Sequence, residues 1–214
     1  TSSGVIISEG DGSIASGYST NSSTIEIQNN SLSSIIHGYS ISGSSMRLME
    51  GNIGSMIIGS SETGSIVQSG SGSIASLINV RATSGTISIG SMSYGSKIFG
   101  YSNNGTITIS DNVHGSQISG IVTNNGQMTI GTLSHGSYLH GYADTSSTIS
   151  IGTNSFGSEC IGLAQNNGTI NNGDLSFGCR ISGWTLSGLL STGSGSCGTI
   201  LYGVAVNSGI INTS

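Results

Sequence analysis

The chain has 214 residues, of which 36 are glycine and none is proline, and only 6% of them are charged. Lys and Arg total 4 against 9 Asp and Glu, and no basic cluster is present, so nucleic acid and anionic membrane surfaces are not expected partners. No stretch reaches the roughly 18 consecutive apolar residues that a membrane-spanning helix needs, which predicts no membrane insertion.

A phrase of roughly 21 residues recurs along the whole chain, and a period of this length is typical of solenoids and other repeat proteins. No charged or proline-rich linker interrupts the repeat, so we expect one continuous domain over residues 1–214. Counted from the second residue of each copy, the units begin at Ser13, Ser34, Ser55, Ser73, Ser96, Ser116, Ser137, Ser158, Cys179 and Thr199. The spacing shortens before Ser73 and lengthens after it, which predicts a weak coil with a longer loop at Val80–Ser84.

Each unit opens with a predicted strand, of which Ser96–Ser102 is typical. The first, third, fifth and seventh residues are small or aliphatic, and this alternation places them on one face, toward a thin interior. The fifth residue is glycine in every copy except one, where Leu77 stands. A glycine at this position indicates that backbone from the opposite wall approaches too closely for a side chain.

A tight reversal follows the first strand, as at Asn103-Asn104-Gly105, whose residues tolerate positive φ. The second predicted strand, Thr106–Ile109, alternates between outward threonine and inward isoleucine. The corner that leads to the next unit carries a large side chain just before its glycine, and we expect these side chains to plug the wide end of each coil. They are Tyr94, His114, His135, Phe156 and Phe177.

A unit of two short strands cannot bury its isoleucines alone, whereas stacked units bury them against one another. The sequence therefore predicts an all-β, single-domain β-solenoid of about ten coils, with about 21 residues and two short strands per coil, in parallel, in-register ladders. The last units depart from the pattern at Leu189–Leu190 and Ile210–Ile211, which we expect to cap the open end of the sheets.

The outward positions of the first strand are unusually apolar, and a stripe of this size is more than soluble monomers usually expose. We therefore predict that self-association covers it. The predicted self-association face comprises Ile14, Tyr18, Ile35, Tyr39, Met56, Ile74, Ile78, Phe99, Tyr101, Ile121, Tyr138, Tyr142, Leu163, Trp184 and Tyr202. The opposite assignment, with this face in the core, would bury Lys97, Glu159 and Arg180, which a dry interior disfavours.

Two short segments, SIASG at Ser13–Gly17 and SIAS at Ser73–Ser76, resemble the S-V-A-I-G phrase of the head repeats of trimeric autotransporter adhesins. That family forms a β-roll in which small residues line the coil and bulky residues pack among three chains. The resemblance implies a bacterial surface adhesin with an apolar trimer seam, although the family's repeat is shorter than this one. It implies no particular binding residue.

Candidate catalytic and metal-binding residues are few. His114 and His135 occupy adjacent corners, but no third ligand is evident, so we expect no metal and no cofactor. Glu159, Asp144 and Asp174 are isolated carboxylates, which we interpret as solvated turn residues. No nucleophile elbow, phosphate loop or metalloprotease motif occurs, so we expect no enzymatic activity.

The three cysteines, Cys160, Cys179 and Cys197, fall in the last units of the chain. Cys160 and Cys179 are expected to point inward from adjacent coils but to lie two positions apart along the strand, too far for a relaxed disulfide. Cys179 and Cys197 are offset in a similar way, and a disulfide between them is the alternative if the corner bends them together. We expect buried free thiols.

The leading hypothesis is an extracellular or cell-surface protein, its leader removed, with a structural or adhesive role. It would associate with itself as a homo-oligomer, either a trimer or an end-to-end fibre, and a host surface or a glycan is a candidate partner.

Ice binding is an alternative, because the second strands present short hydroxyl side chains on a weakly charged wall, similar to the arrays of solenoid antifreeze proteins. Glu26 and Arg47 interrupt this wall near one end. The predicted ice-binding ladder comprises Thr86, Ser88, Thr106, Thr108, Thr129, Thr148, Ser150 and Thr169. A third hypothesis is that the exposed tyrosines and Trp184 stack against glycans.

Overall fold

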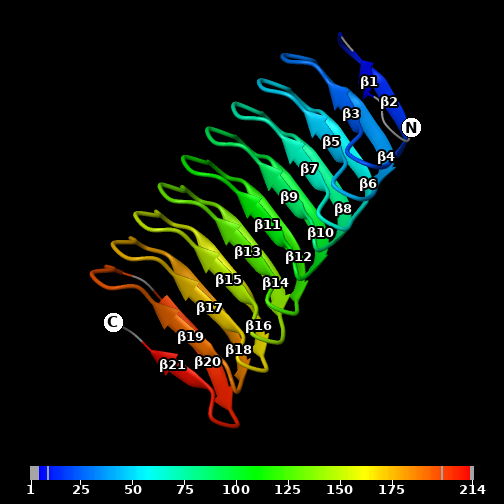
Figure 1. Ribbon diagram of the computed structural model, residues 1–214. Coiled ribbons are helices and arrows are strands. Elements are labelled where there is room, and N and C mark those ends of the chain that lie inside the picture. The colour runs from blue at the N-terminus through cyan, green and yellow to red at the C-terminus, as the bar shows by residue number, and fades with distance from the viewer. Residues whose placement is uncertain (1–4, 9, 199, 213–214) are drawn as a thin grey trace.

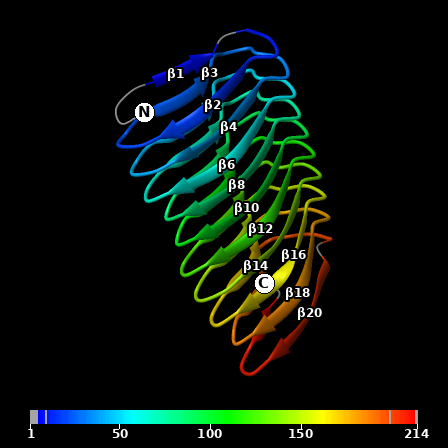
Figure 2. The same ribbon diagram turned by 90° about the vertical axis from the view of Figure 1, so that its right-hand side faces the viewer.

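The computed structural model describes residues 5–8, 10–198 and 200–212, and every regular element within them is a β-strand. The strands form two parallel sheets, which run along a rod whose two ends carry the two ends of the chain (Figures 1 and 2). Partners on neighbouring coils are 21 residues apart at Ser34 and Ser55 and 20 apart at Ser76 and Ser96. These observations confirm the predicted all-β solenoid.

Each complete coil contributes one strand to each sheet. The long-strand sheet has 10 strands: β2 (Ile14–Ser19), β4 (Ile35–Ser40), β6 (Met56–Glu62), β8 (Leu77–Thr83), β10 (Lys97–Asn103), β12 (Gln117–Thr123), β14 (Tyr138–Ala143), β16 (Glu159–Gln165), β18 (Arg180–Leu186) and β20 (Ile200–Val206). The short-strand sheet has 11 strands: β1 (Val5–Ser8), β3 (Thr24–Ile27), β5 (Ser45–Leu48), β7 (Ile66–Ser69), β9 (Thr86–Ile89), β11 (Thr106–Ile109), β13 (Gln127–Ile130), β15 (Thr148–Ile151), β17 (Thr169–Asn172), β19 (Leu189–Thr192) and β21 (Ile210–Asn212).

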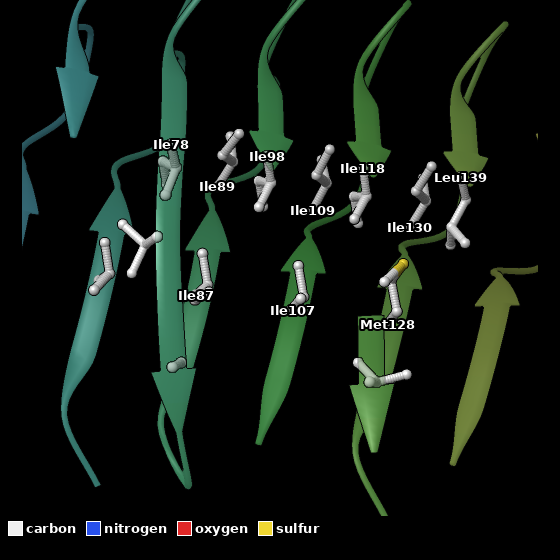
Figure 3. Packing of buried hydrophobic residues seen from close by; sticks show 14 of the residues in the cluster. Ile78, Ile87, Ile89, Ile98, Ile107, Ile109, Ile118, Met128, Ile130 and Leu139 are labelled. Atoms are coloured by element: carbon white, nitrogen blue, oxygen red, sulfur yellow. The ribbon is translucent and has the colours of Figure 1, made fainter. Parts of the chain in front are cut away.

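The core is a thin layer of aliphatic side chains between the two sheets. In β10, Ile98 is buried while Lys97 is exposed, and in β11 both Ile107 and Ile109 are buried. Figure 3 shows these isoleucines and their equivalents from neighbouring coils pointing into the space between the sheets. The predicted alternation of inward and outward residues is therefore confirmed in both strands.

The recurrent glycine of the long strands lies in crowded surroundings, as Gly38 of β4 shows. A Cβ atom on Gly38 would lie 2.6 Å from the carbonyl oxygen of Gly17 and 3.0 Å from Cδ1 of Ile25. The crowding thus comes from the preceding coil of the same sheet as well as from the opposite wall. In β8 the position is occupied by Val80, which is buried.

The reversals between the two strands of a coil use left-handed backbone conformations, as their sequences predict. Asn104 has a φ of 55°, and Asn124 and Asn125 have φ values of 52° and 65°. Asparagine adopts this region more readily than most residues, which explains why it recurs here.

The predicted register of the fourth coil is wrong by three residues. Leu77 pairs with Met56 on one side and Lys97 on the other, so this unit begins at Ser76 and not at Ser73. The observed register buries Ile78, Val80 and Ala82 and leaves Asn79 and Arg81 outside, whereas the predicted one would turn Asn79 inward.

This register moves two residues of the predicted self-association face: Ile78 belongs to the core, and Ile74 lies exposed in the corner before the strand. The segment from Val80 to Thr83 belongs to β8, so the coil spacing stays regular and the longer loop predicted here is absent from the described chain. The SIAS segment at Ser73–Ser76 consequently lies in a corner, unlike the similar segment at Ser13, which leads into β2.

The predicted cap at the end of the solenoid is also wrong. Leu190 is buried in β19, where it continues the aliphatic column, and Ile211 of β21 pairs with it as the next rung. Ile210 and Ile211 are exposed, because no described strand lies beyond β21. Thr199, which begins the last predicted unit, lies outside the described residues.

Candidate functional site: the corner ladder and the outer faces

One corner of the rod carries a continuous row of exposed side chains, which we call the corner ladder. Parallel bridges join its members from coil to coil: Leu32, Ile53, Ile74, Tyr94, His114, His135, Phe156, Phe177 and Cys197. The sequence predicted that the large members would plug the interior, and this prediction is wrong. The residue before each of them, such as Ser93 or Ser134, occupies the inside of the corner and is buried, so the large side chain points outward.

The central part of the corner ladder is a stack of five rings. Neighbouring ring centroids are 5.1 Å apart between Tyr94 and His114 and 4.8 Å apart between His114 and His135. The stack continues through Phe156 to Phe177 with interplanar angles of 7° and 12°. The three inner rings are therefore covered by a ring on both faces, and the two end rings, Tyr94 and Phe177, on one face.

The first part of the corner ladder is aliphatic and joins a second aliphatic row. Leu32, Ile53 and Ile74 are 43%, 42% and 42% exposed. Three residues after each of them, Ile35, Met56 and Leu77 take the first outward position of β4, β6 and β8, where they are partly exposed. We call these six residues the aliphatic corner. Their two rows are parallel to the axis of the rod, because each row is one in-register ladder.

The remaining predicted residues lie on the outer face of the long-strand sheet, as expected: Ile14, Tyr18, Tyr39, Phe99, Tyr101, Ile121, Tyr138, Tyr142, Leu163, Trp184 and Tyr202. The face is nevertheless less apolar than predicted. Arg81 stands where Ile78 was expected, with its guanidinium carbon 5.2 Å from the centre of the Tyr101 ring. Lys97 is exposed in the next strand. The charged side chains of Arg81 and Lys97 thus interrupt the apolar stripe of this face from the fourth coil onward.

The predicted hydroxyl ladder is brought together on the outer face of the short-strand sheet. One row runs from Thr86 through Thr106, Gln127 and Thr148 to Thr169. A second row joins the residues two positions later in each strand: Ser88, Thr108, Thr129, Ser150 and Asn171. Hydroxyls of adjacent coils approach closely, as where Oγ1 of Thr129 and Oγ of Ser150 are 3.3 Å apart. Glu26 and Arg47 are neighbours in the strand register and belong to this second row near the beginning of the rod.

The histidines do not gather into a site. His37 and His140 are exposed on β4 and β14, while His114 and His135 stack in the corner ladder. Within residues 5–8, 10–198 and 200–212, no group of three or more His, Cys, Asp or Glu side chains could hold a metal ion.

The carboxylates are held by structural contacts. Glu159 lies in a strand and not in a turn, and its Oε1 is 3.4 Å from Nη1 of Arg180. The side chain of Asn166 donates a 2.6 Å hydrogen bond to Oδ1 of Asp144, which lowers the pKa of that carboxyl group below its usual value. Oδ1 of Asp174 accepts the backbone N–H of Ser194 at 2.7 Å.

The three cysteines are unpaired, but they differ in exposure. Cys160 and Cys179 are buried, as predicted, whereas Cys197 is exposed because it ends the corner ladder. Burial raises the pKa of both interior thiols. Little of either thiol is therefore ionised near neutral pH.

None of the described residues forms a helix that is long and apolar enough to cross a membrane. No protein-family model matches the chain.

Proposed function

We propose that this chain is a structural or adhesive surface protein that associates with copies of itself through the aliphatic corner. The observation that carries the proposal is the pair of parallel rows described above. Six aliphatic side chains from three successive coils stand together there, and none of them is fully buried. Covering them removes apolar surface from water, which is worth about 25 cal/mol per Å².

A second copy of the chain is the partner that fits this surface best. Because both rows run along the rod, two rods that lie side by side bring the same rows together over several coils, which is the self-complementary geometry of a symmetric oligomer. The six residues carry no charge, so the contact would bury no unpaired ion. An extracellular or cell-surface setting and the trimer suggested by the autotransporter resemblance belong to the same proposal.

The molar mass of the intact chain in solution tests this proposal. Association predicts a mass by light scattering that is a multiple of 21.4 kDa. A strictly monomeric chain at high protein concentration would contradict it.

Ice binding is a second candidate function, supported by the two hydroxyl rows of the short-strand sheet. Strands in a sheet are about 4.8 Å apart and alternate residues in one strand about 6.6 Å apart, so the rows form a rigid rectangular grid. The rows contain no charged side chain between β9 and β17. Such a grid can order water in the regular rows that an ice surface presents.

If the grid binds ice, Thr108→Tyr is expected to abolish most thermal hysteresis, because a bulky ring in the middle of the grid holds ice away from its neighbours. Ser119→Tyr is the matched control, since Ser119 faces outward from β12 on the opposite wall. Nanolitre osmometry measures the effect. Absence of hysteresis in the unmodified chain, or its survival in Thr108→Tyr, would exclude this function.

A further inference from the structure

The outer face of the long-strand sheet contains a hollow between β18 and β20. Its volume is about 240 Å³, and it is lined by Ser182, Gly183, Trp184, Tyr202, Gly203 and Val204. It lies in the last described coils, away from the aliphatic corner, which involves β4, β6 and β8.

The hollow follows from the way large and small residues pair across the two strands. Trp184 pairs with Val204 and Tyr202 pairs with Ser182, so neither ring stands directly beside the other across these two strands. Trp184 is 59% exposed, and Tyr202 is 67% exposed on β20, the last described strand of this sheet. Between them lie Gly183 and Gly203, which pair in the same ladder and form a floor of backbone.

The two rings differ in this respect from the stacked rings of the corner ladder. There each ring covers its neighbour, whereas Trp184 and Tyr202 are not paired with each other, and both keep exposed surface and line the hollow. An aromatic face carries a partial negative charge, and it attracts the C–H groups that cover one side of a sugar ring. A hollow with aromatic walls and a few polar groups is a common form of small-ligand site.

Polar groups for the sugar hydroxyls lie on the same strand. Ser182 offers a hydroxyl, and Arg180 faces outward two residues earlier with its side chain 53% exposed. Glu159 contacts the Arg180 guanidinium at 3.4 Å and balances its charge. Donors and acceptors without net charge suit a neutral ligand better than a sialylated or sulfated one.

We propose that this hollow binds a pyranose ring of a neutral glycan, with Trp184 and Tyr202 as stacking platforms. The site does not depend on self-association through the aliphatic corner, because the two sets of residues share no member. The protein would then bind a glycan as well as other copies of itself.

Trp184 is the single tryptophan of the sequence, so its fluorescence reports on the hollow directly. The intact chain is titrated with cellohexaose, chitohexaose and mannohexaose in separate experiments. We expect a saturable change in the emission of Trp184 with at least one of them, and weakening by about tenfold in Tyr202→Ala. Ser182→Tyr, which places a ring in the hollow itself, is expected to remove the response.

Tyr138→Ala is the matched control, because Tyr138 is 53% exposed on the same face but lies outside the hollow. Circular dichroism checks that each variant keeps the fold. The proposal is overturned if no sugar changes the emission up to its solubility limit, or if Tyr202→Ala and Ser182→Tyr respond as the unmodified chain does. Light scattering on the same samples reports self-association separately, so failure of one proposal is distinguishable from failure of the other.

Discussion

Replacement of Ile107 by alanine is expected to lower the free energy of unfolding by about 2–5 kcal/mol. Ile107 is fully buried in β11, and its partners Ile87 and Met128 on the neighbouring coils are fully buried as well. The substitution leaves a cavity in the thin core between the two sheets, where few neighbours can move to fill it. Urea denaturation followed by circular dichroism measures the loss.

Thr108→Ala is the control for this prediction, since Thr108 is the next residue of β11 and points out of the solenoid. It is expected to change stability by no more than about 0.5 kcal/mol. Equal losses for the two variants would contradict the assignment of the inward and outward faces. A full loss of cooperativity in Ile107→Ala would still agree with it, because repeat proteins can unfold in part from a weakened coil.

Replacement of both Ile53 and Met56 by lysine is expected to abolish self-association. The two residues belong to the aliphatic corner and come from its two rows, so the variant places two like charges in the middle of the proposed contact. Like charges buried opposite one another cost several kcal/mol, which exceeds what a small apolar contact supplies. Neither side chain is buried in the single chain, so the fold is expected to persist.

Ile121→Lys is the matched control for the association experiment. Ile121 is 43% exposed, nearly the same as Ile53 at 42%, but it lies on β12 outside the aliphatic corner. We expect the control to retain the mass of the unmodified chain, while the double lysine variant becomes a monomer. If Ile121→Lys were monomeric and the double variant still associated, the contact would lie on the outer face of the long-strand sheet and not at the aliphatic corner.

The fold could be predicted because the sequence contains two independent periods, the alternation within a strand and the repeat from coil to coil, and both indicate the same structure. Alternation within Thr106–Ile109 defines a strand with one buried face, and its recurrence roughly every 21 residues defines stacking. The reversals were equally predictable, since Asn104 and its equivalents are residues that tolerate positive φ. Local pattern and global repeat point to the same structure, which is typical of sequences that fold to one state.

The errors arose where one short phrase fits two registers. Ser73-Ile74-Ala75-Ser76 imitates the opening of the first unit, and the strand pairing of Leu77 together with the burial of Ile78 decides against it. The wrong register consequently placed the side chains of this coil on the wrong faces. Leu77, for example, belongs to the outer row beside Met56.

The corner ladder was missed for a related reason. A corner has no simple period, so the inward position of Ser93 and the outward position of Tyr94 could not be told apart by alternation. Hydrophobicity then favoured burying the ring, whereas the turn leaves room inside only for the smaller residue. The aliphatic corner combines corner residues with strand residues. It could not be predicted without knowing that Leu32, Ile53 and Ile74 point outward beside the strands.

The proposed contact between copies of this chain through the aliphatic corner is tested most directly by the molar mass across a dilution series at low and high salt. We predict a mass above 21.4 kDa that falls toward this value only on dilution and does not fall when salt is raised, because an apolar contact is not screened. A mass of 21.4 kDa at every concentration, or association that salt dissolves, would contradict the proposed contact.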